Sequence, residues 1–258
     1  MKRVFITGAS SGIGAALARH YAAQGATLGL VARRHELLKE LAASLPNAQR
    51  HQIYALDVTD YAALTDAAGR FIQATGGADI VIASAGISRG TLTEHADDLP
   101  VFENIMATNV TATVATFAPF IGVMKQQAQA GNRDCRLVGI ASVAGVRGLP
   151  GSEAYSASKA AVISYCESLR LEMKKCGIKV VTIAPGFIDT PMTRINKYRM
   201  PFLMPVEKFA RKAAAAIDAG DSFRVFPWQM GMVAKVVRAL PNWLYDMAFS
   251  NAPHKGRR

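Results

Sequence analysis

The sequence predicts a doubly wound α/β fold, in which helices cover both faces of a parallel sheet. Short, nearly continuous β-branched runs recur along the chain, as in strands that are buried on both faces. Segments with helical spacing separate these runs, and each is long enough for a crossover between parallel strands. No Pro/Ser-rich linker and no repeat interrupts the 258 residues, so we expect one domain.

Strands and helices are expected to alternate along the chain. We expect strands at 3–8, 27–32, 52–56, 79–86, 135–142, 178–186 and 223–227. We expect helices between them at 13–24, 34–44, 60–74, 100–129 and 152–176. Gly76-Gly77 and Cys176-Gly177 are typical of helix ends, since each stands just before an expected strand.

Composition and charge exclude several classes of protein. Hydrophobic residues make up 50% and charged residues 19% of the chain, which is typical of globular domains. The first apolar run breaks after Ile6, and no later run reaches the roughly 18 residues of a membrane span, so we expect a soluble, cytoplasmic protein. The net charge of +11 favours anionic partners, but the basic residues are scattered, and we expect no nucleic-acid binding. Cys135, Cys166 and Cys176 lack metal-ligand spacing, which predicts reduced, buried thiols and no metal site.

The first expected strand is followed by a glycine-rich turn, "TGASSGIG", that opens into an Ala-rich helix. Gly8, Gly12 and Gly14 allow a tight turn and a close approach to the backbone, so that free N–H groups and the positive helix end can hold a pyrophosphate. Packing of the strand against the helix would by itself explain two of the three glycines. The position after the first strand favours a dinucleotide site.

The end of the second expected strand, "VARR", indicates which dinucleotide is bound. An NAD site usually has an acid there, which accepts a hydrogen bond from the ribose 2′-hydroxyl. Ala32 occupies that position, and Arg33 and Arg34 follow it with planar donors that suit a 2′-phosphate. The alternative is a solvated start of the next helix, but the missing acid favours NADP(H) as the cofactor.

The segment "GIASVAGVRGLPGSEAYSASKAA", 139–161, contains three reactive side chains. Ser142 ends a strand at the sheet edge where open α/β sheets bind ligands, and Tyr155 and Lys159 stand at i and i+4 on one helix face. A phenol has a pKa of about 10, and a neighbouring ammonium lowers it towards neutral pH. Ser142 would hydrogen-bond a carbonyl or alkoxide oxygen while Tyr155 exchanges a proton with it.

With these motifs the sequence resembles the short-chain dehydrogenase/reductase family, from Met1 to about residue 226. The shared motifs, in family order, are "TGASSGIG", "DV" at 57–58, "ASAG" at 83–86, Asn109 in "NIMATNV", Ser142, "YSASK" and "PGFIDTPM". The resemblance implies a Rossmann-like fold and the interconversion of a carbonyl and an alcohol by hydride transfer. It also implies a homodimer or homotetramer formed through helices around 110–124 and 155–171.

The resemblance implies a role for each matching position. The catalytic tetrad would be Asn109, Ser142, Tyr155 and Lys159, with Asn109 holding a water that relays protons to Lys159. The residues that would bind the cofactor are Gly8, Ser10, Ser11, Gly12, Ile13, Gly14, Arg33, Arg34, Asp57, Val58, Ala85, Gly86, Tyr155, Lys159, Pro185, Gly186, Ile188 and Thr190. The family's usual Asn-Asn-Ala-Gly is Ala83-Ser84-Ala85-Gly86 here, so one support between strands is expected to differ.

The chain divides into a dinucleotide-binding and catalytic core at 1–226 and a C-terminal helical extension with a basic tail at 227–258, packed on the same domain. The core includes a segment at 190–205 in the family's substrate-lid position. Its apolar residues are Met192, Met200, Phe202, Leu203 and Met204, and its basic residues are Arg194, Lys197 and Arg199. We expect a bulky apolar carbonyl substrate that could carry a negative group, or else a lid that packs on its own core.

Residues 228–249 are predicted to form an amphipathic helical segment. On a helical wheel one sector holds Met230, Val233, Val236, Val237 and Leu240, and the opposite sector holds Gly231, Lys235 and Arg238. Packing of the apolar sector on the core or on a subunit is favoured, and peripheral contact with a membrane surface is the alternative.

The sequence thus predicts an NADP(H)-dependent oxidoreductase that acts on an apolar small-molecule carbonyl or alcohol. Two alternatives with the same fold are a catalytically silent dinucleotide sensor and a membrane-surface binding protein. The intact set of Asn109, Ser142, Tyr155 and Lys159 argues against a silent sensor.

Overall fold

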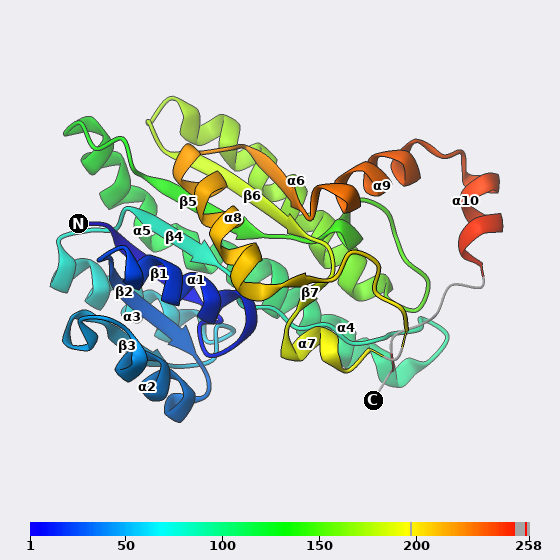
Figure 1. The fold of residues 1–258 in the computed structure, drawn as a ribbon, viewed down its shortest axis with the longest axis horizontal. Coiled ribbons are helices and arrows are strands. Elements are labelled where there is room, and N and C mark those ends of the chain that lie inside the picture. The colour runs from blue at the N-terminus through cyan, green and yellow to red at the C-terminus, as the bar shows by residue number, and fades with distance from the viewer. Residues whose placement is uncertain (197, 251–255, 257–258) are drawn as a thin grey trace.

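A computed structural model describes residues 1–196, 198–250 and 256 of the chain, and it confirms the doubly wound α/β fold (Figure 1). Seven parallel strands form one sheet in the order β3-β2-β1-β4-β5-β6-β9. They are β1 (Arg3–Thr7), β2 (Thr27–Ala32), β3 (Gln52–Ala55), β4 (Ile80–Ala83), β5 (Arg136–Ile140), β6 (Lys179–Pro185) and β9 (Phe223–Phe226). Lys197 of the lid and Lys255, Arg257 and Arg258 of the tail lie outside the described residues.

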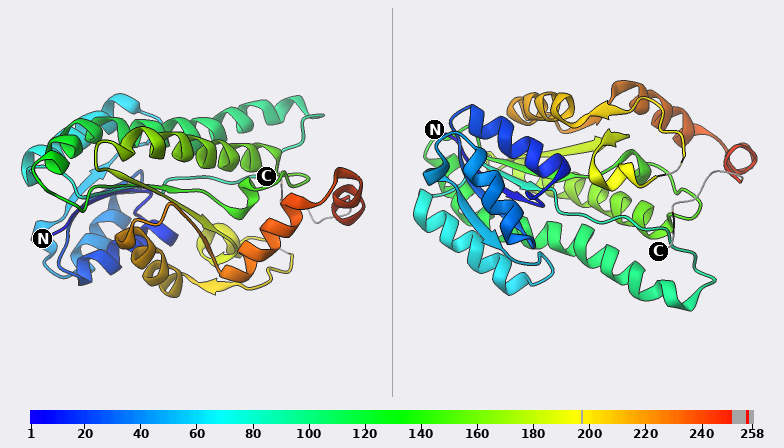
Figure 2. Two further views of the ribbon diagram at one scale, coloured as in Figure 1. Left: turned by 90° about the horizontal axis from the view of Figure 1, so that it is seen from above. Right: turned by 60° about the horizontal axis from the view of Figure 1, so that its bottom comes forward.

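Two layers of helices cover the sheet (Figure 2). On one face lie α1 (Gly12–Ala23), α2 (His35–Ser44) and α8 (Val206–Ala219), which share a core with Val4 and Ile6 of β1. On the other face lie α3 (Tyr61–Thr75), α5 (Ala112–Gln129) and α6 (Glu153–Lys174), which share a core with Phe5. Because successive side chains of a strand point to opposite faces, β1 contributes to both cores.

The expected helix at 100–129 is divided in the structure. A π-helical turn, Ala107–Thr111, joins α4 (Leu99–Met106) to α5. By length and composition alone, the helical run 96–129 is apolar enough to cross a membrane. We interpret it as a core helix, because Phe117, Phe120 and Met124 are buried in the layer that covers the sheet.

The lid segment forms two small elements that the sequence did not predict. A two-stranded sheet joins β7 (Ile188–Asp189) to β8 (Met204–Pro205), and the short helix α7 (Pro191–Arg194) follows β7. This strand pairing brings the two ends of the lid segment together.

The C-terminal segment forms two helices, α9 (Trp228–Ala239) and α10 (Asn242–Phe249). Helix α9 ends before Pro241, because proline has no N–H and disfavours the helical conformation of the residue before it. Met230 is buried, whereas Val233 and Val236 are 44% and 58% exposed. The two valines therefore do not pack on the core, which lies on the Met230 side of the helix, and their predicted packing on a subunit stays a prediction.

The strand order reverses beside β1, which pairs with β2 on one side and with β4 on the other. The connections that leave β1 and β4 therefore run to opposite faces of the sheet. The carboxyl ends of these strands are left open, which is where ligands bind in doubly wound folds.

Candidate active site

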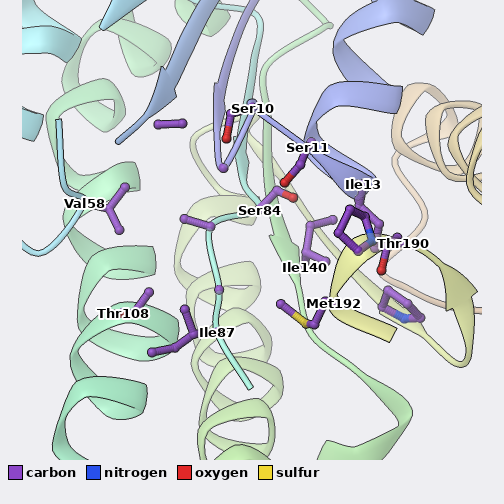
Figure 3. A pocket seen from close by; sticks show the side chains of 18 of the residues that line it. Ser10, Ser11, Ile13, Val58, Ser84, Ile87, Thr108, Ile140, Thr190 and Met192 are labelled. Atoms are coloured by element: carbon purple, nitrogen blue, oxygen red, sulfur yellow. The ribbon is translucent and has the colours of Figure 1, made fainter. Parts of the chain in front are cut away.

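A cleft opens at the carboxyl edge of the sheet, next to the ends of β1 and β4. All the residues predicted to bind a cofactor line this cleft, and so does Ser142. Figure 3 shows Ser10, Ser11 and Thr190 at this cleft, with Val58 and Ile87 also in its lining. The fold thus brings together residues from distant parts of the chain, while the role of each one stays a prediction.

The three glycines of the turn after β1 have different surroundings. Gly8 has φ +70°, and a Cβ on it would lie 2.8 Å from the Cα of Ala85. A Cβ on Gly14 would lie 2.3 Å from the carbonyl oxygen of Gly8. A Cβ on Gly12 would make only ordinary van der Waals contact with Thr190, at 3.5 Å, but Gly12 has φ +54°, which disfavours other residues. Close packing therefore requires Gly8 and Gly14, and the backbone conformation favours glycine at position 12.

The start of α1 fits the diphosphate of a dinucleotide. The N-cap residue Ser11 makes no side-chain cap to the helix, so its hydroxyl does not satisfy the first amides of α1. These amides and the positive end of the helix dipole can bind an anion. Because Ser11, Gly12 and Ile13 line the cleft, the residues present can hold such a group.

Arg34 lies across the glycine-rich turn. Its Nη2 donates to the hydroxyls of Ser10 and Ser11, at 3.1 and 3.0 Å. The buried Ala32 ends β2 and brings no carboxylate to this corner of the cleft. A guanidinium and two hydroxyls are donors that suit a phosphate group. We call Arg34, Ser10 and Ser11 the arginine corner.

Arg33 has a different partner. Its Nη1 lies 3.6 Å from a carboxylate oxygen of Asp57, and its side chain is 69% exposed. Burial would raise the pKa of Asp57, but hydrogen bonds from Thr59 and the Arg33 guanidinium outweigh this and lower it. Arg33 is therefore partly neutralised by Asp57, whereas no acid pairs with Arg34 among the described contacts at this corner.

Thr7 provides the support between strands that the sequence left open. Its buried Oγ1 accepts hydrogen bonds from the N–H groups of Ser84 and Ala85, at 3.2 and 3.3 Å. This contact ties the end of β1 to the end of β4 beneath the cleft. Thr7 is the first residue of the motif "TGASSGIG", but a threonine at this position does not by itself predict which backbone groups it contacts.

Ser142 is held between β5 and α6. It precedes the short 3₁₀ turn Val143–Gly145, and its Oγ donates to the carbonyl oxygen of Pro185 at 3.4 Å. Gly145 lets this turn pack closely on α6, because a Cβ there would lie 2.5 Å from the backbone of Lys159. The close contact fixes Ser142 relative to the helix that carries Tyr155 and Lys159.

Lys159 is buried beside Tyr155. Its Nζ donates to the carbonyl oxygen of Ile140 at 2.9 Å and lies 5.8 Å from the centre of the Tyr155 ring. Burial lowers the pKa of Lys159 to about 8. Burial also raises the pKa of Tyr155, although its hydrogen bond with Ser142 acts in the opposite direction. The prediction of a lowered pKa for Tyr155 is therefore wrong for this structure, because desolvation of the phenolate outweighs the stabilising contacts.

Asn109 lies in the π-helical turn and is completely buried. Its Nδ2 donates to the Ile87 carbonyl at 3.0 Å and to Ser158 Oγ at 2.9 Å, and its Oδ1 accepts from the Ile87 N–H at 2.9 Å. Ser158 in turn donates to the Tyr155 carbonyl at 2.8 Å. Asn109 therefore ties the segment after β4 to the start of α6, and its predicted role in a proton relay stays a prediction.

The lid offers fewer free cations than the sequence indicated. Arg194 donates to a carboxylate oxygen of Asp189 at 2.7 Å from an exposed position, so one carboxylate already pairs with it, and its availability to an anion stays a prediction. Lys197 lies outside the described residues, and Arg199 is exposed. Of the predicted basic residues of the lid that the structure describes, Arg194 is paired with Asp189, and Arg199 has no acidic partner among residues 198–205.

The apolar side chains of the lid are mostly exposed. Met192 lines the cleft and is 37% exposed, whereas Phe202 and Leu203 are 51% and 45% exposed. Met204 is buried in β8. Ile195 of the same segment, which was not among the predicted lid residues, is 68% exposed.

Several lining residues were missed by the sequence analysis. They share positions at or just after strand ends or on the π-helical turn, and they are Leu56, Ser84, Ile87, Thr108, Ile140 and Ala141. The rule that ligands bind beyond the carboxyl ends of parallel strands could have identified most of them. Across residues 1–196, 198–250 and 256, no group of three or more His, Cys, Asp or Glu side chains could hold a metal ion.

Comparison with known proteins extends the similarity over almost the whole chain. The family model described as short chain dehydrogenase matches residues 2–199. An uncharacterized oxidoreductase of Myxococcus xanthus is 35% identical over 253 residues, which is 96% of each chain.

Two solved structures are similar to the fold. The 3-ketoacyl-(acyl-carrier-protein) reductase of Brucella melitensis, complexed with NADH, has a TM-score of 0.78 at 25% identity and covers 87% of this chain and 94% of its own. The alcohol dehydrogenase of Thermococcus sibiricus, complexed with 5-hydroxy-NADP, has a TM-score of 0.77 at 21% identity and covers 88% and 96%. At 21% identity the second likeness shows the fold alone.

Proposed function

The chain belongs to the short-chain dehydrogenase/reductase family, and we propose that it is an NADP(H)-dependent oxidoreductase that interconverts a carbonyl and an alcohol. One observation carries the proposal: the arginine corner and the set of Ser142, Tyr155 and Lys159 line the same cleft. Recognition of the cofactor and transfer of the proton can therefore occur in one site.

The arginine corner supports NADP(H) over NAD(H). The donors of Arg34 and the hydroxyls of Ser10 and Ser11 suit a 2′-phosphate, and Ala32 offers no acceptor for a ribose 2′-hydroxyl. The similar structures do not decide between the two, since the Thermococcus protein is complexed with an NADP derivative and the Brucella protein with NADH. The choice rests on the residues of this chain.

The bound cofactor would supply or accept the hydride at the reacting carbon. In the reductive direction, Ser142 Oγ and the Tyr155 phenol would hold the carbonyl oxygen, and Tyr155 would donate its proton to that oxygen. The raised pKa of Tyr155 keeps the phenol protonated at neutral pH until this transfer. The neighbouring Lys159 ammonium would then stabilise the phenolate that remains.

We propose an apolar substrate from the lid. Met192 lines the cleft, and Phe202 and Leu203 present exposed apolar surface in the same segment. Flexible and aromatic side chains of this kind contact bulky apolar groups well. A panel in which small polar ketones are reduced and long-chain or cyclic ketones are not would overturn this part of the proposal.

The cofactor assignment is tested by calorimetric titration with NADPH and NADH in one buffer. We expect the protein to bind NADPH at least about tenfold more tightly, and Arg34→Ala to remove most of that preference. The exposed Arg211, which lies away from the cleft, supplies a control with the same loss of charge, and Arg211→Ala should keep the preference. Equal binding of the two cofactors would overturn the NADP(H) assignment and leave the family's chemistry intact.

A catalytically silent dinucleotide sensor is the second candidate, since the cleft would bind cofactor in either case. Turnover separates the two: consumption of NADPH with the carbonyl panel supports the oxidoreductase, and tight binding without turnover supports the sensor. The positions of Ser142, Tyr155 and Lys159 at one cleft favour the oxidoreductase.

We also propose a homodimer or homotetramer formed through α5 and α6. Val114 and Leu171 on these helices are 38% and 60% exposed, although most apolar side chains of both helices are turned to the core. Light scattering after gel filtration that shows only a monomer would overturn this proposal.

A further inference from the structure

The helix α9 presents apolar side chains to solvent. Trp228, Met232 and Val236 recur at i, i+4 and i+8, and they are 68%, 55% and 58% exposed. The opposite side of the helix is the one that packs, because a Cβ on Gly186 would lie 2.7 Å from Met230. A surface helix ordinarily turns polar residues outward, so the outward face of α9 lacks the pattern of a solvated surface.

The helix α10 also presents apolar side chains to solvent. Trp243 and Met247, at i and i+4, are 68% and 69% exposed. Of the 16 large apolar side chains that are exposed in the described part of the chain, six lie on α9 and α10. We call these six the C-terminal apolar face: Trp228, Met232, Val233, Val236, Trp243 and Met247. Such a concentration is typical of a binding surface rather than of scattered surface residues.

The C-terminal apolar face is carried by helices that are fixed to the core. Arg147 donates from Nη1 to the carbonyl oxygens of Val237 and Leu240, both at 2.6 Å, and satisfies acceptors at the end of α9. Its guanidinium lies 4.0 Å from the centre of the Tyr245 ring, and the Tyr245 hydroxyl donates to the Gly148 carbonyl. Figure 1 shows α9 and α10 at one end of the molecule, beyond the edge of the sheet.

The C-terminal sequence is basic. Residues 228–258 contain one acidic residue, Asp246, and five basic residues, so they contribute +4 of the net charge of +11. Lys235 and Arg238 lie on α9, whereas Lys255, Arg257 and Arg258 lie outside the described residues. Lys235 is exposed on α9, next in sequence to Val236 of the face.

We propose that the C-terminal apolar face docks on the surface of an anionic lipid bilayer. Amphipathic helices that lie in a membrane interface combine Trp and aliphatic side chains with Lys and Arg, as α9 does. Acidic headgroups would attract Lys235 and Arg238 of this helix. The proposal is independent of the reaction and cofactor proposed above.

Charge favours a bilayer over a second copy of the chain as the occupant of this face. Self-association through α9 would bring Lys235 and Arg238 of two chains, each carrying +11, close to one another. Like charges disfavour such a contact, whereas an anionic surface attracts them.

The two tryptophans of the chain supply a direct test, since Trp228 and Trp243 both belong to the face. Their emission is recorded as the protein is titrated with vesicles of phosphatidylcholine alone and with vesicles that also contain phosphatidylglycerol. We expect a shift to shorter wavelength and quenching by brominated acyl chains with the anionic vesicles, together with co-sedimentation at physiological salt. No other tryptophan contributes to the signal.

Matched variants separate docking from nonspecific attraction. Val236→Asp on the face should weaken vesicle binding at least about tenfold, because a carboxylate disfavours insertion, whereas Leu99→Asp should not. The two positions are comparable, at 58% and 60% exposed. Lys235→Glu should weaken binding more than Lys39→Glu, which makes the same charge change on an exposed position of α2.

Three outcomes would overturn the proposal. The first is tryptophan emission that does not change with anionic vesicles. The second is an equal loss of binding in Val236→Asp and Leu99→Asp. The third is a lipid-free shift of the emission with protein concentration, accompanied by a smaller particle for Val236→Asp in light scattering, which would assign the face to a second copy of the chain.

Discussion

The sheet core and the C-terminal helices use apolar side chains in opposite ways. Val4, Phe5 and Ile6 of β1 are completely buried, whereas Trp228 and Trp243 are each 68% exposed. In the central strands of the sheet, helices on both faces bury the apolar side chains, so a continuous apolar run there predicts burial. The apolar sector of an amphipathic helix at the end of a chain can be either buried or exposed, because the pattern defines the sector without showing which side of the helix meets the core. The difference teaches that burial can be read from a pattern only where the partner surface is also known.

The largest expected effect lies in the cleft. Tyr155→Phe removes the proton donor and should lower the turnover rate by about 10²–10⁴-fold. The affinity for NADPH should change much less, because the aromatic ring stays in the cleft. Steady-state rates and a cofactor titration measure the two quantities. Tyr61→Phe, at an exposed position on α3, is the control. Unchanged turnover in Tyr155→Phe would show that Tyr155 is not the proton donor. The cleft could then be only a binding site, like the C-terminal apolar face.

The next effect is a gain in stability at the cost of activity. Lys159 is buried with a pKa lowered from 10.5 to about 8, so the folded, cofactor-free protein is destabilised while this lysine is charged. Lys159→Met should remove that charge and raise the free energy of unfolding at pH 7 by up to about 3 kcal/mol. Turnover should be lost in the same variant.

The pH dependence of Lys159→Met has a defined sign. In the wild type the charged lysine destabilises the folded protein below about pH 8, and this cost disappears as the pH rises from about 8 to about 10.5. The stability difference between Lys159→Met and the wild type should therefore shrink over that range in chemical denaturation. If the difference in unfolding free energy between the variant and the wild type stays constant over this pH range, the burial of the Lys159 charge does not cause it.

Much of the fold and of the cleft could be predicted because the residues carry local rules. Strand ends, glycine turns and the positions of Ser142, Tyr155 and Lys159 follow from periodicity and from the family's motifs. The support from Thr7 to Ser84 and Ala85 could not be predicted, since it joins residues that are distant in the chain. The raised pKa of Tyr155 could not be predicted either, because it depends on burial, which the spacing of Tyr155 and Lys159 does not report.

A pair of glycine substitutions sharpens the comparison between a constrained turn and an open surface. Gly14→Ala would place a Cβ 2.3 Å from the Gly8 carbonyl oxygen, and we expect it to cost about 1–3 kcal/mol of stability and to weaken cofactor binding. Gly69→Ala on α3 meets nothing within 4 Å and should stabilise the protein by about 0.5–1 kcal/mol. Thermal unfolding with and without NADPH measures both, and equal shifts in the two variants would contradict the packing explanation.

The smallest expected effect concerns the attachment of the C-terminal helices. Arg147→Ala removes the hydrogen bonds to Val237 and Leu240 and the contact with the Tyr245 ring. We expect the local opening of α9 and α10 to become easier by about 1 kcal/mol, which is about a fivefold faster amide hydrogen exchange in these helices. The global unfolding midpoint should change little, because the sheet core does not depend on this contact.

The control for Arg147→Ala is Arg238→Ala, since Arg238 also joins α9 to the segment after Ser142 but donates a single bond to the Val146 carbonyl at 3.2 Å from an exposed position. Its effect on exchange should be smaller. If Arg147→Ala instead lowers the global midpoint by as much as Gly14→Ala does, the C-terminal helices unfold together with the core. They would then be an integral part of the domain, and the contrast between a self-contained core and an attached binding surface would fail.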